Sequence, residues 1–146
     1  MSGAIRIGIE KEHEAYVLYV TLARDPKIAS ISKIFSMLAV QELRHERLLN
    51  KILETGDFVH AKEESAQEYE KDLDILEAID SDTSIPDAAA GIALAIEREK
   101  KAYEAYADLA SKADSPEEQD IFEMLAKEEF HHQEVLEDAM RDVVNQ

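Results

Sequence analysis

The chain contains no cysteine and no tryptophan among its 146 residues, and only 4 glycines and 3 prolines. Without cysteine it can form no disulfide, and it cannot use thiolates for catalysis, zinc binding or iron–sulfur ligation. Any metal site must therefore be built from carboxylates and imidazoles. The scarcity of glycine and proline, together with runs rich in alanine, glutamate, leucine and lysine, favours helices.

Basic residues are also few, since 16 lysines and arginines face 33 acids and the formal net charge is −17. The chain has no basic stripe, so the composition argues against binding to nucleic acid or to an anionic membrane surface. No stretch approaches the length of apolar sequence that crosses a membrane, and the N-terminal residues lack a signal-peptide pattern. We therefore expect a cytoplasmic protein with one domain over residues 1–146.

Two segments of the chain recur at a constant offset of 87 residues. Residues 9–23 and 96–110 are identical at 8 of 15 positions, and residues 34–49 and 121–136 are identical at 8 of 16. The shared offset indicates that one helix pair was duplicated whole, which predicts two halves related by a pseudo-two-fold axis. The halves cover about residues 1–56 and 86–146, and a connection over 57–85 joins them.

Turn and capping residues divide the chain into four long helices, over about residues 3–24, 27–55, 86–112 and 116–143. Gly56 ends the second helix, Ser84 and Pro86 begin the third, and Ser115 with Glu118 forms a capping box at the fourth. The connection predicts a short amphipathic helix, because apolar side chains recur at helical spacing at Tyr69, Leu73, Leu76 and Ile79. These elements predict an all-α, antiparallel four-helix bundle of two helix hairpins joined by one long crossover.

Six polar residues interrupt the apolar faces of the four long helices. A lone glutamate fills a gap in the apolar stripe of the first helix and of the third. On the second and fourth helices, apolar residues surround a Glu-x-x-His motif, whose spacing places both side chains on one face. At about 1.5 Å of rise per residue, all of these positions reach nearly the same height in the bundle. They are Glu12, Glu42, His45, Glu99, Glu129 and His132.

Four buried carboxylates in one layer would repel one another unless other charges compensate them. No lysine or arginine occupies a matching inward position in both halves. Two divalent cations would neutralise the four carboxylates, and the two imidazoles would complete the ligand set, with the lone glutamates bridging or capping the pair. The alternative is a polar layer whose hydrogen bonds only fix the register of the helices.

Two further Glu-x-x-His pairs do not recur, because their counterparts in the other half do not keep both residue types. They are Glu10 with His13 and Glu128 with His131. Glutamate is so frequent in this chain that a single pair carries little information. We interpret these four side chains as solvent-exposed residues of helix faces, and His60 in the connection as a surface residue.

Four tyrosines lie on the apolar stripes of the first and third helices. Tyr19 and Tyr106 follow the lone glutamates by seven residues, so their hydroxyls could hydrogen-bond to a ligating carboxylate across the bundle and hold its orientation. Tyr16 and Tyr103 are interpreted as core aromatic residues. A second apolar face on the first helix indicates packing against the crossover or a homodimer, and it comprises Ile7, Val17, Leu18 and Val20.

The paired motif resembles that of the ferritin-like di-iron superfamily and, within it, the rubrerythrin-type domain. In this chain, as in that family, a lone glutamate precedes a Glu-x-x-His motif twice, and a tyrosine follows each lone glutamate by seven residues. The resemblance covers all four helices and implies that the six inward residues bind two iron ions, although manganese or zinc also suits such ligands. It implies a di-ferrous site that hydrogen peroxide or O2 oxidises, as in peroxidases, ferroxidases and iron-storage proteins.

This sequence departs from rubrerythrins at two points. They typically add a cysteine-ligated rubredoxin domain, so a chain without cysteine needs an external electron donor. They also carry a second carboxylate one turn from the lone glutamate of the third helix, where this sequence has Ile96 and Ala102. We expect a rubrerythrin-like peroxide reductase with no catalytic residue assigned beyond the metal ligands. The alternatives are a ferroxidase or iron-storage protein, and a metal-binding four-helix interaction module without catalysis.

Overall fold

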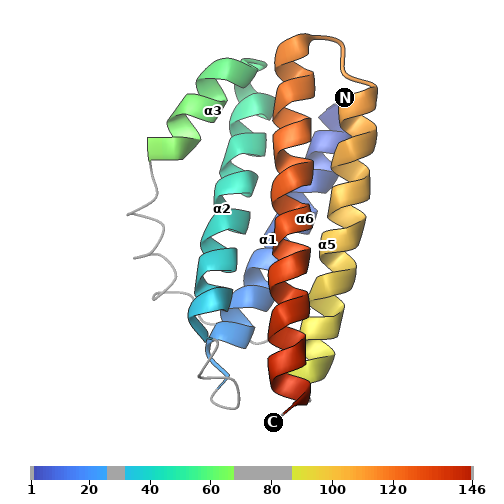
Figure 1. Ribbon diagram of the computed structural model, residues 1–146. Coiled ribbons are helices and arrows are strands. Elements are labelled where there is room, and N and C mark those ends of the chain that lie inside the picture. The colour runs from blue at the N-terminus through green and yellow to red at the C-terminus, as the bar shows by residue number, and fades with distance from the viewer. Residues whose placement is uncertain (1, 26–31, 68–86, 146) are drawn as a thin grey trace.

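The computed structural model describes residues 2–25, 32–67 and 87–145. Within these residues the secondary structure is entirely helical, and the helices are α1 (Ser2–Ala23), α2 (Ser32–Thr55), α3 (Phe58–Gln67), α5 (Ala88–Ser111) and α6 (Pro116–Val144). The α1–α2 and α5–α6 pairs each form an antiparallel hairpin, and the two hairpins pack lengthwise into one bundle (Figure 1). The predicted all-α, ferritin-like four-helix bundle is therefore confirmed.

Capping contacts fix the ends of three of these helices. The Glu118 amide donates to Ser115 Oγ at 3.1 Å, which is one of the two bonds of the predicted capping box, and the Glu118 carboxylate accepts from the amide of Asp114, one residue before the N-cap, at 3.2 Å. Gly56 ends α2 with a φ of 70°, a left-handed conformation that favours glycine. The start of α5 differs from the prediction, because Asp87 caps it by accepting from the Ala90 amide at 2.8 Å.

The short helix α3 is an element that the sequence analysis missed. Its N-terminus is capped by Asp57, which accepts from the His60 amide at 3.0 Å. Phe58 then packs edge-on against Phe122 of α6, with ring centroids 6.3 Å apart, and Ala61 is buried. In this way α3 covers one end of α2 and α6 (Figure 1). The predicted helix at residues 69–79, the residues 27–31 and the predicted signals Ser84 and Pro86 lie outside the described residues.

The apolar core consists of two clusters that lie on either side of the predicted polar positions along every long helix. One cluster includes Tyr19, Leu22, Phe35, Ile92 and Leu136. The other includes Ile5, Leu49, Tyr106, Phe122 and Leu125. Each cluster draws residues from all four long helices, so apolar packing above and below holds the polar layer at a fixed height.

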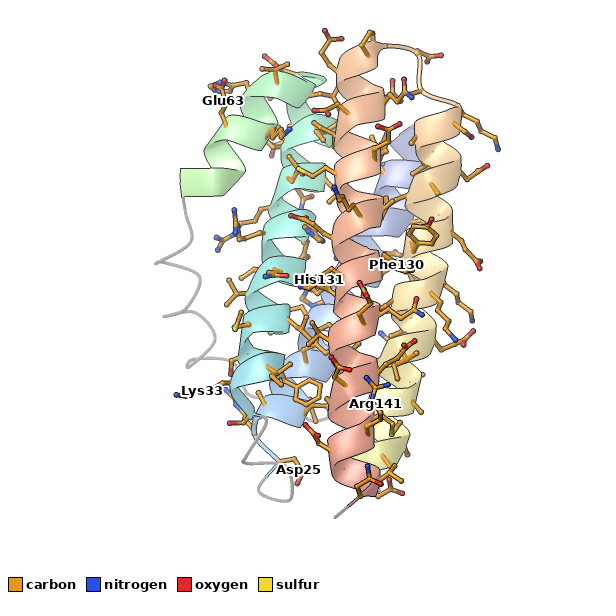
Figure 2. The ribbon with its side chains drawn as sticks, viewed as in Figure 1. Asp25, Lys33, Glu63, Phe130, His131 and Arg141 are labelled. Atoms are coloured by element: carbon orange, nitrogen blue, oxygen red, sulfur yellow. The ribbon has the colours of Figure 1, made fainter. Side chains whose placement is uncertain are left out.

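The apolar residues of the predicted second face of α1 differ in exposure. Leu18 and Val20 are 4% and 2% exposed and belong to the core, and the crossover predicted to cover this face lies mostly outside the described residues. Ile7, by contrast, is 59% exposed. Tyr103 is also exposed instead of buried, and its ring packs on Phe130 at 5.5 Å, on the outward side of α6 (Figure 2).

No helix in the described ranges combines the length and the apolar composition needed to cross a membrane.

Candidate metal centre

Each of the four long helices contributes side chains to one buried polar layer. All six residues predicted from the repeat lie in it, and none is more than 5% exposed. Their nitrogen and oxygen atoms form two groups, in each of which the candidate ligand atoms lie within 4.8 Å of one another. The first group comprises Glu12, Glu42, His45 and Glu129, and the second comprises Glu42, Glu99, Glu129 and His132.

The two groups share two of their glutamates. Glu42 and Glu129, which come from the Glu-x-x-His motifs, belong to both groups, whereas Glu12 and Glu99 belong to one group each. The sequence left open whether the lone glutamates would bridge or cap a metal pair. This geometry places the lone glutamates at the two ends and the motif glutamates between them.

Each histidine points its Nδ1 atom at a glutamate of the other hairpin. His45 Nδ1 lies 2.8 Å from Glu129 Oε1, and His132 Nδ1 lies 2.8 Å from Glu42 Oε1. The two imidazole rings are nearly parallel, with their centroids 6.0 Å apart and an interplanar angle of 15°. The arrangement reproduces in space the two-fold relationship that the duplication predicts.

Every residue of the layer has one buried polar atom that lacks a hydrogen-bond partner among the described residues. The short His–Glu distances do not change this, because the atoms are not aligned as hydrogen bonds. An unpartnered buried polar group costs about 1–3 kcal/mol, and more when it is charged. The atoms are Glu12 Oε2, Glu42 Oε1, His45 Nδ1, Glu99 Oε2, Glu129 Oε1 and His132 Nδ1.

These six atoms fit a pair of divalent cations. The same atoms approach one another, since His45 Nδ1 lies 3.5 Å from Glu12 Oε2 and His132 Nδ1 lies 3.6 Å from Glu99 Oε2. Two divalent cations would balance the four carboxylate charges. A carboxylate and imidazole donor set suits iron, manganese and zinc. Each group can therefore hold a metal ion, and the assignment of these residues as ligands remains a prediction from the sequence that this geometry supports.

The four glutamates form two classes with opposite pKa shifts. Burial, reinforced by the negative charges of the other glutamates, raises the pKa of Glu42 and of Glu129 well above the usual range. Burial acts in the same direction on Glu12 and Glu99, but hydrogen bonds from Glu42 and Glu129 and the nearby histidines outweigh it and lower the pKa of both. Without metal, these shifts favour protonation of the two shared glutamates over the two lone glutamates.

The surroundings of His45 favour the protonated form of its imidazole when no metal is bound. Burial alone would lower the pKa of His45, but the charge of Glu12 and contacts with Glu128 and Glu129 raise that pKa well above its usual value. A proton on this imidazole partly compensates the surrounding carboxylates. Metal binding must displace that proton from Nδ1.

A tyrosine of each hairpin donates a hydrogen bond to the lone glutamate of the other hairpin. The Tyr106 hydroxyl donates to Glu12 Oε1 at 2.5 Å, and the Tyr19 hydroxyl donates to Glu99 Oε1. Burial and the charge of the accepting glutamate raise the pKa of both tyrosines well above the usual range, so both hydroxyls keep their protons. These are the contacts that the seven-residue spacing predicts, and each leaves the second carboxylate oxygen facing the layer.

The outward nitrogens of the histidines have partners that the sequence analysis did not identify. His45 Nε2 lies 2.6 Å from Glu128 Oε2, and His132 Nε2 hydrogen-bonds to the side-chain oxygen of Gln41. Glu128 is exposed, as predicted, with a side chain that is 47% accessible, and it also contacts His45. A signal was present in the sequence, since Gln41 and Glu128 are equivalent in the repeat and both can accept a hydrogen bond.

The other members of the non-recurring motifs stay outside the layer. Glu10, His13 and His131 are exposed on the surface of the bundle, and Figure 2 shows His131 on the outward side of α6. His60 is exposed as well, as expected. None of these four residues belongs to either ligand group.

A cavity of about 580 Å³ lies between α1 and α5 and reaches the layer. Small residues line its walls, namely Gly8, Ala15, Ala102 and Ala105, and charged residues such as Lys11 and Lys101 lie at its rim. The carboxylates of Glu12, Glu42, Glu99 and Glu129 also line it. Small molecules can therefore approach the layer between these two helices.

Comparison with known proteins gives an independent assignment of the chain. Searches of curated proteins and of solved structures returned no match. A model of the rubrerythrin family, by contrast, matches residues 4–140. This span contains the whole buried layer and both tyrosines that contact it. The chain therefore belongs to the rubrerythrin family.

Proposed function

We propose that the protein is a di-iron oxidoreductase that reduces hydrogen peroxide with electrons from an external donor. The observation that carries this proposal is the set of six buried ligand atoms without hydrogen-bond partners. The first ligand group would hold one ion and the second group the other, with Glu42 and Glu129 shared. Membership of the rubrerythrin family favours iron, since the ligands themselves also suit manganese and zinc.

A bound iron pair would supply two electrons, one from each ion, which together with two protons reduce one hydrogen peroxide molecule to two water molecules. The residues of the chain prepare the site for this chemistry. Tyr19 and Tyr106 hold Glu99 and Glu12 so that one oxygen of each faces the layer. Since the chain has no cysteine, it has no thiolate-ligated centre of its own, and re-reduction requires an external donor.

The same cavity favours a ferroxidase as a second candidate. Its volume of about 580 Å³ far exceeds the roughly 30 Å³ that one water molecule occupies in the liquid, so it does not select an oxidant by size. Ala102, one of the two positions at which the family's additional carboxylate is missing, lines this cavity. A path lined by carboxylates and small side chains suits the entry of Fe(II) and the exit of its oxidised product.

The two candidates differ in their reaction with oxidants. Metal-free protein is titrated with Fe(II) under anaerobic conditions and mixed in a stopped-flow instrument with equal concentrations of hydrogen peroxide or O2. The near-ultraviolet absorption of oxidised iron reports the reaction. We expect faster oxidation by hydrogen peroxide, and turnover that stops unless a reductant is added.

Two other outcomes would replace this proposal. If O2 oxidises the site at least as fast as peroxide, and added Fe(II) is converted to a mineral, the protein is a ferroxidase. If the metal-free protein is fully stable and neither binds Fe(II) nor develops the near-ultraviolet band, the layer only fixes helix register and the bundle is an interaction module.

We also propose that two chains associate. Ile7 and Leu94 are equivalent in the repeat, are 59% and 49% exposed, and both line the cavity between α1 and α5. A pair of apolar side chains related by the pseudo-two-fold axis suits an isologous contact with a second copy. Sedimentation of the wild type and of Ile7→Glu/Leu94→Glu tests this, and a monomeric wild type would contradict it.

A further inference from the structure

The two inward histidines differ in the group that contacts their outward nitrogen. His45 Nε2 faces the carboxylate of Glu128 at 2.6 Å, whereas His132 Nε2 faces the amide oxygen of Gln41. Residues 41 and 128 are separated by the 87-residue offset of the duplication, so they are the same position in the two halves. This position therefore carries a negative charge in one half and a neutral amide in the other.

Both contacts select the same tautomer of the imidazole. A carboxylate oxygen and an amide oxygen can only accept a hydrogen bond, so Nε2 must carry the hydrogen in each ring. The lone pair of Nδ1 is then free to bind a metal ion, and Nδ1 is the atom that faces the glutamates. Glu128 and Gln41 are thus positioning residues for His45 and His132.

The two partners do not have the same effect on the ring. A carboxylate polarises the Nε2–H bond more than a neutral amide does, so it increases the electron density and the basicity of Nδ1. The remaining ligands do not create such a difference, because each group has one lone glutamate bound by a tyrosine and the same two shared glutamates. The pair at positions 41 and 128 is therefore a chemical difference between the groups at residues that contact a ligating histidine directly.

We propose that Glu128 and Gln41 make the two metal positions inequivalent, so that the group containing His45 binds its ion more tightly and is filled first. This inference rests on the metal-binding function proposed above and adds an order of filling to it. Removing a hydrogen-bond partner of a ligating histidine typically changes metal affinity by about 10–100-fold. Because Glu128 is half exposed, we expect the lower part of that range, about tenfold.

The order of filling can be measured with Zn(II) as a diamagnetic probe. Metal-free protein labelled with ¹⁵N-histidine is titrated with Zn(II), and the ring nitrogens of His45 and His132 are followed by NMR. The exposed His13, His60 and His131 serve as internal references. We expect the first equivalent of Zn(II) to shift the Nδ1 resonance of His45 and the second equivalent to shift that of His132.

Exchange of the two residues supplies the decisive control. Two neighbouring cations repel each other, so stepwise binding alone would prove nothing, and the identity of the histidine that responds first is the readout. Glu128→Gln and Gln41→Glu each make the two positions alike and should abolish the preference. The double variant Gln41→Glu/Glu128→Gln should reverse the order, an outcome that general damage to the fold cannot produce.

Three results would overturn the inference, and they are distinguishable. Simultaneous shifts of His45 and His132 in the wild type, with two ions bound, would refute the inequivalence and leave the metal-binding proposal intact. An unchanged order in the double variant would show that other residues set the preference. If neither Fe(II) nor Zn(II) binds to the wild type, the proposed function itself fails, and this inference fails with it.

Discussion

The Tyr106 hydroxyl lies 2.5 Å from Glu12 Oε1, and this hydrogen bond joins two residues that are 94 positions apart in the chain. Tyr19 makes the equivalent contact with Glu99 in the opposite direction, so the two hydrogen bonds cross between the hairpins. Each bond uses the carboxylate oxygen that does not face the layer. The tyrosines therefore connect the orientation of the candidate ligands to the packing of the two apolar clusters, to which their rings belong.

Replacing Tyr106 by phenylalanine should weaken metal binding without disrupting the fold. The ring remains to fill its place, but Glu12 loses a buried hydrogen bond to a charged group, which contributes about 1.5–3 kcal/mol. We expect metal affinity to fall by about 10–100-fold. Anaerobic Fe(II) titration measures the affinity, and circular dichroism checks the fold. Tyr103→Phe, whose ring is exposed, is the matched control, and an equal loss in both variants would contradict the prediction.

The sharing of glutamates predicts unequal effects of ligand substitutions. Glu42→Ala or Glu129→Ala removes an oxygen from both groups and should leave fewer than about one ion per chain after Fe(II) loading. Glu12→Ala damages one group and should leave about one ion. Glu10→Ala alters an exposed residue and should leave metal content unchanged. Metal analysis of the desalted proteins decides, and equal losses in all four variants would refute the assignment.

Metal-free protein should become more stable on mild acidification. The pKa values of Glu42, Glu129 and His45 are raised in the fold, so between the unfolded and folded values the folded chain binds more protons. These three groups stabilise the fold fully when the pH is below their pKa in the unfolded chain. The stabilisation is lost as the pH rises through their pKa in the folded chain. The pKa values of Glu12 and Glu99 are lowered in the fold. These two residues therefore stabilise the fold when the pH is above their unfolded-state pKa, and this stabilisation is lost as the pH falls through their folded-state pKa.

The melting temperature of metal-free protein should therefore rise from about pH 7.5 to about pH 5.5, and fall again below about pH 4 as Glu12 and Glu99 are protonated. Protein saturated with Mn(II) is the control. Metal stabilises the folded state and competes with protons for the same atoms, so its melting temperature should fall over the upper range. A steady fall for the metal-free protein from pH 7.5 downwards would argue against clustered carboxylates.

Helical periodicity and the internal repeat were enough to predict the bundle and the six residues of the layer. Glu12 and Glu99 interrupt apolar stripes at the same repeat position, and burial of an acid at such a position follows from the spacing alone. The heights of Glu42 and Glu129 followed from helix length, because the rise per residue is constant. These features depend on single helices and on the duplication, both of which the sequence contains.

Features that depend on contacts between helices could not be predicted in the same way. Tyr16 and Tyr103 occupy the same repeat position, yet the first is buried and the second is 39% exposed, so their neighbours decide the outcome. The contact of Glu128 with His45 depends on the rotation of α6 relative to α2, which no single-helix pattern specifies. The short helix α3 was not predicted because it buries too few apolar residues to give the sequence a recognisable helical periodicity.

Filling the cavity between α1 and α5 should slow access to the layer without removing a ligand. Ala102 lines this cavity, and Ala102→Phe would add a large ring to the path that reaches the glutamates. Because all six candidate ligands remain, we expect two ions per chain at equilibrium, with slower Fe(II) uptake and slower oxidation by both hydrogen peroxide and O2. Stopped-flow absorption measures the rates. Ala93→Phe, at an exposed position of α5 outside the cavity lining, is the control and should react like the wild type. Unchanged rates in Ala102→Phe would show that oxidants and iron reach the layer by another route.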